Sequence, residues 1–428
     1  MTLLIKNGHV VDPANGIDRV CDILVEGNRI VKVEKDISVR AGQTIDAKGK
    51  IVIPGIVDMH VHLREPGRED KETVASGTKA AIKGGVTSVL AMPNTTPALD
   101  SDETLKALNS IIQKTAHANV YICAAITKGR RGHELTDFGA LKELGAVAFS
   151  DDGDSVADDA LFLEAFKEAR KHDLVITCHS EDKKLSRGGV MNLGYTSTRL
   201  GLMGISKESE YKCIERDISL AEKAKAKVHI SHVSCSESLE IIARAKKRGV
   251  LVTCETAPHY FTLTDEDICD YNTNMKINPP IRTKEDREAM KEGLRNGTID
   301  VIASDHAPHT ENEKDIEFDL ASFGSIGLET ELALSITQLI KPGILNWTQL
   351  VEKMSYHPSK ILGLNKGTLS VGADADIAVI SPDKEWVVKK EDIVSKSKNS
   401  AFLEKSLKGS VEATICNGKI VYQNEGIT

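Results

Sequence analysis

The middle of the chain, from about residue 54 to 365, alternates short apolar runs with segments of helical periodicity. The apolar runs predict eight strands, over residues 56–63, 86–92, 119–126, 146–150, 174–179, 227–232, 250–256 and 300–305. Apolar residues recur at helical spacing between them, for example over residues 160–170 and 236–246. This alternation favours an α/β fold of the (β/α)8 TIM-like barrel type. An open doubly wound sheet is the alternative, but the sequence lacks the Gly-rich phosphate-binding turn expected after an early strand.

Both ends of the chain show a different pattern, with short alternating strands separated by turns. Such runs occur at residues 3–6, 22–26, 29–33, 44–46 and 50–53, and again at 375–380, 385–388 and 411–422. Asn7-Gly8 predicts a hairpin turn after the first run, and Gly27-Asn28 separates two later runs. Neither end alone offers a full core. We therefore expect a small β-sandwich domain built from residues 1–53 plus 366–428, beside a barrel domain of residues 54–365.

The composition is ordinary for a globular protein and excludes several classes of function. The 428 residues are 40% hydrophobic and 28% charged, and the net charge is -8. This charge argues against a nucleic-acid partner and against long-range attraction of an anionic substrate, so any anion site must be local. The eight cysteines form no Cys-x-x-Cys pair, the chain does not open on a signal peptide, and no apolar run suits a membrane helix. We expect a cytoplasmic protein with reduced cysteines and no membrane partner.

The first predicted barrel strand has one apolar face and one polar face. Val57, Met59, Val61 and Leu63 fall on the side expected to pack against helices, whereas Ile56, Asp58, His60 and His62 fall on the other side. Polar groups inside an apolar strand are costly unless they bind something. Two imidazoles two residues apart can bind one metal ion, and zinc is the commonest choice. Asp58 is expected to accept a hydrogen bond behind a ligand.

Residue types that bind metals recur at the ends of other predicted strands, which is where a barrel of this kind carries its chemistry. The candidates are His60, His62, the pair Asp151-Asp152, His179, His232 and Asp305. They exceed what one tetrahedral zinc ion requires and suit two metal ions that share a carboxylate. His229 and His306 adjoin candidates but are expected to point away, as packing residues or as residues that support a ligand.

Further polar residues are expected on the same rim. Arg64, Asn94, Asn278 and His309 all follow predicted strands or lie in the loops beyond them. A guanidinium together with amide and imidazole donors suits a substrate that bears a carboxylate. Asn-Pro and Asn-Thr pairs are also ordinary turn signals, so each residue alone is equally compatible with a loop role.

Several motifs resemble those of the amidohydrolase superfamily and, within it, the class I dihydroorotases. The resemblance covers nearly the whole chain. The His60-Val-His strand marks only the superfamily, whereas Arg64-Glu-Pro-Gly and Met92-Pro-Asn-Thr narrow the match to the dihydroorotase branch. The other matching motifs are Phe149-Ser-Asp-Asp-Gly, Ile176-Thr-Cys-His-Ser-Glu, Ile230-Ser-His-Val-Ser, Cys254-Glu-Thr-Ala-Pro-His-Tyr and Ile302-Ala-Ser-Asp-His-Ala-Pro-His.

The resemblance implies a zinc site with assigned ligands. One zinc ion would be bound by His60, His62 and Asp305, the second by His179 and His232, and Asp152 with a hydroxide would bridge them. Many members of the superfamily bridge their metals with a carboxylated lysine at the end of the fourth strand. Residues 146–154 contain no lysine, which favours the dihydroorotases that use an aspartate. Such relatives hold one zinc ion or two, and we expect two.

The resemblance also implies an activity, namely reversible cyclisation of N-carbamoyl-L-aspartate to L-dihydroorotate in de novo pyrimidine biosynthesis. Asp305 would be the catalytic proton carrier. The substrate contacts would be His62, Arg64, Asn94, Asn278, His309, Phe323 and Gly324. The alternatives are a related cyclic amidase, such as an allantoinase, a hydantoinase or a dihydropyrimidinase, and a non-catalytic dihydroorotase-like subunit of an aspartate carbamoyltransferase complex. Such subunits typically lose metal ligands, and this chain keeps all the candidates.

The resemblance further implies a homodimer and leaves an association with aspartate carbamoyltransferase open. The sequence also leaves open whether residues 310–322 form a lid over the site.

Overall fold

The computed structural model describes residues 2–268 and 270–424. Cys269 lies outside the described residues, and the other seven cysteines are buried free thiols. Within these ranges, no helix combines the length and the apolar character that crossing a membrane requires.

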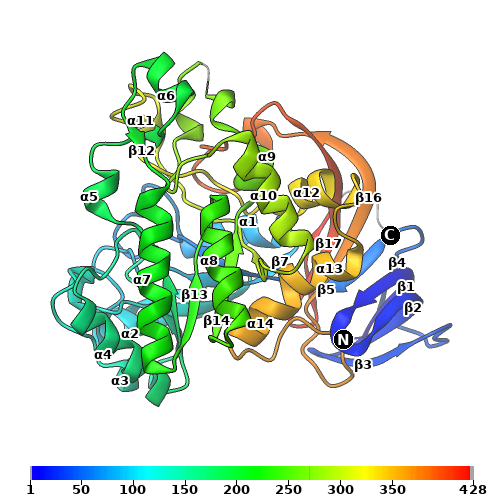
Figure 1. The fold of residues 1–428 in the computed structure, drawn as a ribbon. Coiled ribbons are helices and arrows are strands. Elements are labelled where there is room, and N and C mark those ends of the chain that lie inside the picture. The colour runs from blue at the N-terminus through cyan, green and yellow to red at the C-terminus, as the bar shows by residue number, and fades with distance from the viewer. Residues whose placement is uncertain (1, 269, 425–428) are drawn as a thin grey trace.

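Parallel strands form a barrel at the centre of the molecule (Figure 1). Each strand pairs with the next one along the chain, and the first and last strands meet where the His62 N–H donates to His306 O at 2.9 Å. This arrangement confirms the predicted (β/α)8 barrel. The barrel strands are β6 (Ile56–Val61), β7 (Val86–Ala91), β8 (Asn119–Ala124), β9 (Ala146–Phe149), β10 (Val175–Cys178), β13 (Lys227–Ile230), β14 (Val252–Thr256) and β15 (Val301–Ile302).

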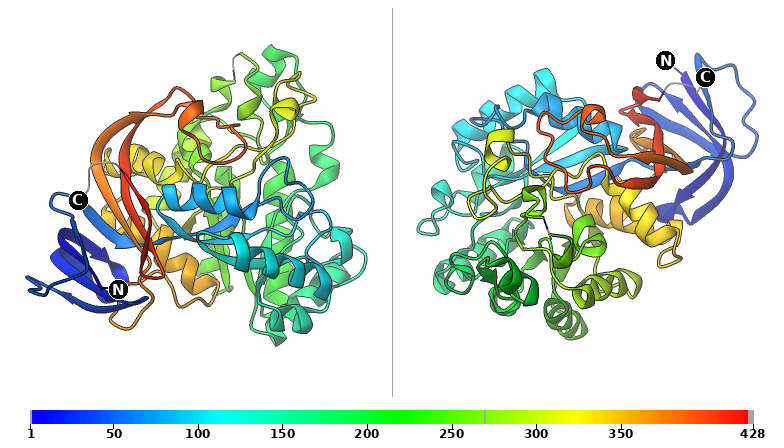
Figure 2. Two further views of the ribbon diagram at one scale, coloured as in Figure 1. Left: turned by 180° about the vertical axis from the view of Figure 1, so that it is seen from behind. Right: turned by 90° about the horizontal axis from the view of Figure 1, so that it is seen from above.

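Helices surround the barrel, as the view from above shows (Figure 2). The segments predicted over residues 160–170 and 236–246 are helices α4 and α8. The outer faces of the strands and the inner faces of the helices share one large core, which includes Ile122, Phe166 and Ile242. The main covering helices are α1 (Val74–Lys83), α2 (Asp102–Thr115), α3 (Phe138–Glu143), α4 (Asp159–Lys171), α7 (Glu208–Ala224), α8 (Ser236–Lys247), α10 (Lys284–Arg295), α12 (Glu331–Ser335), α13 (Trp347–Val351) and α14 (His357–Ile361).

Several short elements lie at the end of the barrel that is uppermost in Figure 1. Most of them belong to the long connection between β10 and α7, and two follow β14 and β15. Because the carboxyl ends of the strands carry the long connections, this end is the natural place for a binding site. The elements are α5 (Lys183–Ser186), β11 (Met191–Asn192), α6 (Tyr195–Leu200), β12 (Gly204–Ile205), α9 (Pro258–Thr262) and α11 (Glu311–Lys314).

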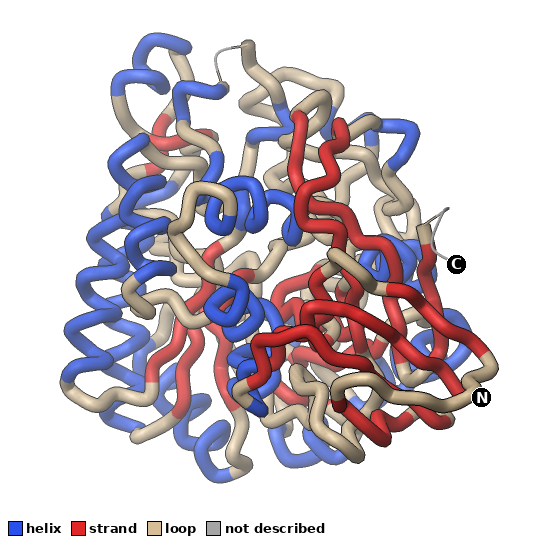
Figure 3. The backbone as a smooth tube through the Cα atoms, turned by 90° about the vertical axis from the view of Figure 1, so that its right-hand side faces the viewer, coloured by secondary structure: helices blue, strands red, loops and turns tan. Residues whose placement is uncertain are grey.

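The two ends of the chain form one mixed sheet, on the side of the molecule that carries both termini (Figure 3). Its order is β18-β17-β16-β5-β1-β2-β3, with β4 paired to β1. The predicted sandwich therefore takes the form of one continuous sheet, because β5 and β16 pair directly. The sheet has its own core, which includes Ile23, Val52 and Val379. The strands are β1 (Thr2–Asp12), β2 (Ile17–Glu26), β3 (Arg29–Glu34), β4 (Gln43–Asp46), β5 (Ile51–Pro54), β16 (Ile377–Val387), β17 (Ser406–Cys416) and β18 (Lys419–Gln423).

The chain between β16 and β17 leaves this sheet and packs on the barrel. Val388 and Ala401 belong to the barrel core. The Ser395 hydroxyl bonds to Glu72, and the Ser397 hydroxyl donates to Lys71 O at 2.7 Å. The C-terminal segment is thereby attached to the loop that follows the first barrel strand.

Two local predictions are wrong. Asn7-Gly8 forms no hairpin turn, because Asn7 adopts a left-handed conformation as an irregularity inside β1, where Asp22 and Asp46 accept its hydrogen bonds. Met59 does not pack with Val61 and Leu63 but in a separate cluster with side chains of neighbouring strands. The pairing of β6 with β7 shifts register twice, so strict alternation along β6 fails.

We predict that Phe149→Ala destabilises the barrel. Phe149 is fully buried at the end of β9 and stacks on Phe138 at a ring separation of 3.9 Å. Removing the ring should lower the free energy of unfolding by about 3–5 kcal/mol, measured by urea denaturation. Phe149→Leu, which keeps most of the volume, should cost clearly less. Equal losses in the two variants would contradict a packing role.

Candidate active site

Strand ends bring the candidate metal ligands together at one end of the barrel. All of them are buried, and they come from strands that are far apart in the sequence. His60 is the last residue but one of β6 and His62 follows that strand. Asp152 follows β9, His179 follows β10, His232 follows β13, and Asp305 follows β15. Parallel strands whose carboxyl ends face the same way make this convergence possible.

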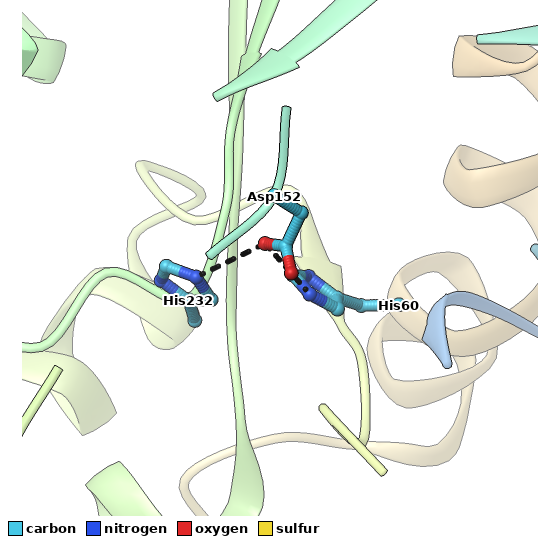
Figure 4. Close-up of side chains that lie close together, drawn as sticks. All are labelled: His60, Asp152 and His232. Carbon is cyan, nitrogen blue, oxygen red and sulfur yellow. Dashed lines mark ion pairs between the residues drawn. The ribbon is translucent and has the colours of Figure 1, made fainter. Parts of the chain in front are cut away.

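The ligand atoms form two overlapping groups that could each hold a metal ion, with His60 common to both. In one group, His62 Nε2 lies 3.3 Å and His60 Nε2 lies 3.7 Å from Asp305 Oδ1. In the other, Asp152 Oδ1 lies 3.3 Å from His60 Nε2 and 3.8 Å from His232 Nε2 (Figure 4). His179 Nδ1 adjoins the second group at 2.9 Å from His232 Nε2. The other oxygen of Asp152 lies 3.6 Å from His62 Nε2, so this carboxylate of the second group also adjoins the first.

Unsatisfied polar atoms show that these residues fit a cation. Among the described residues, none supplies a hydrogen-bond partner to His60 Nε2 or Asp152 Oδ1, although both atoms are buried. His179 Nδ1 and His232 Nε2 lie 2.9 Å apart, and Asp152 Oδ1 lies 3.8 Å from both nitrogens. Buried polar atoms normally have partners. Nitrogen and oxygen donors in such an arrangement are the usual ligands of zinc.

Three residues of the site adopt a strained backbone conformation. Arg64, His232 and Asp305 have φ values of 61°, 36° and 47°. Non-glycine residues rarely adopt positive φ, and they do so mainly where the surrounding structure imposes it. At His232 and Asp305 this conformation occurs at the point where the strand ends and the side chain turns into the site.

Asp151 and Asp152 point in different directions, as the alternation of an extended chain requires. Asp151 Oδ1 accepts from the Thr127 backbone N–H at 3.0 Å, and its other oxygen accepts from the Thr127 hydroxyl. Asp152 faces the histidines. Burial alone would raise the pKa of Asp152, but the charge of His60 and the nearby imidazoles of His232 and His62 outweigh it and hold this pKa well below its usual range.

Glu255 supports the site and was not identified from the sequence. Its Oε1 accepts from His60 Nδ1 at 2.6 Å, and its Oε2 accepts from His229 Nε2 at 3.1 Å. A carboxylate behind a histidine fixes the ring so that its other nitrogen faces the metal. Asp58 accepts instead from the backbone N–H groups of His60 and Ser304. The sequence feature that could have identified Glu255 is its position as a single carboxylate within the apolar run of β14.

The other two flagged histidines have structural partners. His229 lies behind His60 through Glu255, and His306 accepts from the Gly327 N–H at 3.2 Å and approaches Glu72 at 3.4 Å. Neither belongs to a ligand group, which agrees with the expectation that both point away from the site.

A cavity of about 320 Å³ opens beside the ligands. It is lined by all the predicted substrate contacts, which are His62, Arg64, Asn94, Asn278, His309, Phe323 and Gly324. Residues of the connection after β10, such as Lys183 and Ile205, complete the wall. The structure thus brings the rim residues and the ligand groups to one cavity.

Arg64 carries a half-buried guanidinium, and no ion pair joins it to any described residue. Its Nε donates to Pro308 O at 3.2 Å, and one of its terminal nitrogens lies 3.3 Å from His309 Nε2. Burial lowers the pKa of Arg64 to about 10, so the group is still charged at neutral pH. A charge that is partly removed from water and has no counter-ion is costly, and an anion in the cavity would compensate it.

The two asparagines link the cavity to the ligands. Asn94 Oδ1 accepts from His62 Nδ1 at 2.8 Å, and its Nδ2 donates to Asp152 Oδ2 at 3.4 Å. Asn278 Nδ2 donates to Glu181 Oε2 at 3.1 Å, and this carboxylate lies 3.1 Å from His179 Nε2. Both asparagines therefore lie within hydrogen-bonding distance of groups that orient the site.

Asn399, from the segment between β16 and β17, hydrogen-bonds to the backbone of the cavity wall formed by the loops after β15. Its Oδ1 accepts from the His309 N–H, and its Nδ2 donates to Ala307 O and Gly324 O, all at 3.1 Å. Gly324 has a φ of 139°, and a Cβ there would lie 2.8 Å from Ala307 Cβ, so only glycine fits. No sequence pattern indicated Asn399, because its partners are distant in the chain.

Comparison with known proteins places the chain in a family. Residues 49–238 match the family model described as Dihydro-orotase-like. The dihydroorotase of Elusimicrobium minutum is 54% identical over 424 residues, with coverage of 99% of this chain and 98% of the relative. The dihydroorotase of Acetivibrio thermocellus is 50% identical, with coverage of 99% of both chains.

The chain belongs to the dihydroorotase family. Its fold is shared with more distant enzymes of known structure. The L-hydantoinase (dihydropyrimidinase) from Arthrobacter aurescens superposes with a TM-score of 0.90 at 27% sequence identity, over 100% of this chain and 97% of the other. A D-hydantoinase superposes with a TM-score of 0.86 at 26% identity, over 99% of this chain and 96% of the other.

We predict that Asp152, and not Asp151, is required for metal binding by this member of the dihydroorotase family. Asp152→Ala should lose metal, most of all the ion near His179 and His232, because it removes the carboxylate between the two ligand groups. Metal content per chain after dialysis would be measured by mass spectrometry.

Asp151→Ala is the matched control. It should lower stability through Thr127 and leave metal content near that of the unsubstituted protein. Recovery of activity should not depend on bicarbonate during metal reconstitution, because a carboxylate needs no carbon dioxide to form. Full metal occupancy in Asp152→Ala, or a requirement for bicarbonate, would show that the bridge is assigned wrongly.

Proposed function

We propose that this chain is a zinc-dependent dihydroorotase that interconverts N-carbamoyl-L-aspartate and L-dihydroorotate in de novo pyrimidine biosynthesis. The observation that carries the proposal is the half-buried guanidinium of Arg64, which has no ion pair among the described residues and lies beside the candidate metal ligands. A cyclic amide with a carboxylate substituent matches both features. Relatives named dihydroorotase over the full chain support the same activity.

The donor set fits two zinc ions that share Asp152. One ion would be held by His60, His62 and Asp305 and the other by His179 and His232, in agreement with the orphaned atoms of His60 and Asp152. When bound, zinc supplies Lewis-acid polarisation of the amide carbonyl and lowers the pKa of water that acts as the nucleophile.

The chain's own residues bind and orient the substrate and move the proton. Arg64, Asn94 and His309 bind the carboxylate and fix the ring before the chemistry begins. Asp305 Oδ1 lies 3.3 Å from His62 Nε2, and Asp305 lines the cavity. The pKa of Asp305 is about 2, because the neighbouring imidazoles of His62, His60 and His232 outweigh the effect of burial. As a carboxylate it takes the proton in hydrolysis and returns it to the ring nitrogen that leaves. Ring closure uses the same groups in reverse.

The proposal also covers the oligomeric state of the chain, its location in the cell and its partners. From the family resemblance we propose a homodimer in the cytoplasm, with association to aspartate carbamoyltransferase as a further state. Sedimentation of the protein alone and mixed with that enzyme would test both statements.

We predict that Arg64→Ala weakens catalysis on dihydroorotate without loss of metal. Removing one partner of a buried guanidinium–carboxylate contact should cost about 2–5 kcal/mol in kcat/KM. Dihydrouracil has the same ring without the carboxylate, so its slow turnover should change little. A hydantoinase-like enzyme would show the opposite preference, with dihydrouracil the better substrate before any substitution.

Arg68→Ala provides the control for Arg64→Ala, because it removes a nearby guanidinium that is well exposed. It should leave kcat/KM for both substrates close to the unsubstituted values. If Arg64→Ala barely changed kcat/KM for dihydroorotate, the carboxylate would have to be bound elsewhere.

We predict that Asp305→Asn removes most turnover, by at least about a hundredfold, because it deletes the proton carrier. Circular dichroism and metal analysis would establish that the variant is folded and loaded, and dihydroorotate hydrolysis would be followed by its ultraviolet absorbance. Asp315→Asn, at an exposed position in the same loop region, should retain activity. Near-normal turnover by metal-loaded Asp305→Asn would exclude the proton-carrier role.

A further inference from the structure

His309 lies between two cationic side chains inside the protein. Its Nε2 faces the cavity and lies 3.3 Å from the Arg64 guanidinium. Its Nδ1 faces the opposite way and lies 3.1 Å from Lys71 Nζ. Lys71 is 6% exposed and His309 is 8% exposed, so water competes little for either group.

The ammonium of Lys71 is held in place by Glu313, whose two carboxylate oxygens both accept hydrogen bonds from neighbouring groups. Glu313 Oε1 lies 2.8 Å from Lys71 Nζ and also accepts from Arg68 at 3.1 Å. Glu313 Oε2 accepts from the Thr310 N–H and hydroxyl, both at 3.0 Å. That oxygen lies 3.6 Å from His309 Nδ1, which is too far for a hydrogen bond. Lys71 is therefore the hydrogen-bonding neighbour of Nδ1.

The inventory of protons decides which tautomer His309 adopts. Both cations are donors without acceptors, so either Nδ1 accepts from Lys71 at 3.1 Å or Nε2 accepts from Arg64 at 3.3 Å. The shorter contact is the one to Lys71, which favours Nδ1 as the acceptor. Burial lowers the pKa of His309 far below its usual range, and the charges of Arg64 and Lys71 lower it further, so the ring is neutral. A neutral imidazole carries one N–H. With Nδ1 as the acceptor, that N–H is on Nε2.

With this tautomer, two hydrogen-bond donors line the same wall of the cavity, the guanidinium of Arg64 and the Nε2–H of His309. The guanidinium of Arg64 is donor-only, and so is the Nε2–H of His309, so the two groups cannot satisfy each other. A single acceptor with two oxygens can satisfy both, and a carboxylate does so with charge-assisted bonds.

We propose that Lys71 is a positioning residue that fixes the Nε2–H tautomer of His309, so that the imidazole donates to the carboxylate of the substrate. Lys71 does not touch the substrate itself. Without it, the proton can move to Nδ1 and approach Glu313, and the lone pair on Nε2 then faces an anion. The inference rests on the proposed function for the identity of the anion, but the tautomer itself is a property of the free protein.

The direct test is nitrogen NMR of the metal-loaded protein labelled with 15N-histidine. Protonated and unprotonated imidazole nitrogens resonate far apart, and the signals of His309 are identified by their absence in His309→Gln. The unsubstituted protein should show His309 protonated at Nε2 only. Protonation at Nδ1, or at both nitrogens, would overturn the proposal without reference to any activity.

The kinetic test uses Lys71→Met, which keeps the length of the side chain and removes the donor. KM for dihydroorotate should rise roughly tenfold to a hundredfold with a smaller change in kcat, as expected for a lost hydrogen bond to a charged group. Turnover of dihydrouracil should be unaffected. Arg68→Gln, which removes the other cation on Glu313 but no donor to His309, should leave KM for dihydroorotate unchanged.

A double-substitution cycle separates this role from a structural one. In the His309→Gln background there is no tautomer to fix, so adding Lys71→Met should change KM by less than about twofold. If Lys71 were merely structural, Lys71→Met would raise KM for dihydroorotate by the same factor in the unsubstituted protein and in His309→Gln. That result would overturn the proposal. Failure of the unsubstituted enzyme to turn over dihydroorotate would instead contradict the proposed function, whatever the NMR shows.

Discussion

Asp152 carries a buried negative charge on which the rest of the active site depends. One of its oxygens lies within 3.8 Å of imidazole nitrogens from three other strand ends, those of His60, His179 and His232. A lone carboxylate in such a place would be strongly destabilising, and a cation shared with the imidazoles removes that cost. The site is therefore expected to bind metal as a unit, and the left-handed backbone at His232 and Asp305 is tolerated because it serves this convergence.

The two ends of the chain contribute to the site although they form a separate sheet. β16 and β17 extend from that sheet onto the barrel, and the segment between them carries Asn399 to the loop after β15. Asn399 binds the backbone of His309 and Gly324, so the cavity wall that contains His309 is attached to the C-terminal part of the chain. This attachment gives a physical reason for building the sheet from both ends of the chain, because the paired strands β5 and β16 fix the segment relative to the barrel.

The features that could be predicted from the sequence are those with a local signal. The barrel and the candidate ligands were accessible because several of the apolar runs end at, or just before, a residue type that can bind a metal, as at His179 and Asp305. Glu255 was missed because its role depends on pairing with His60, which lies on a distant strand. The bulge at Asn7 was misjudged as a turn because tertiary partners outweighed a local preference.

The charges of the cavity explain how a protein with a net charge of -8 can select an anion. Its overall field does not attract a carboxylate, so selection must occur at short range. On one side of the cavity lie the ligand groups, and on the other lie Arg64 and His309, both offering donors. Under the proposed function, a substrate that satisfies only one side leaves either an uncompensated guanidinium or a carbonyl away from the candidate metal ligands. Recognition of the carboxylate and alignment of the amide would then be one event, because the rigid barrel fixes the separation between the two sides.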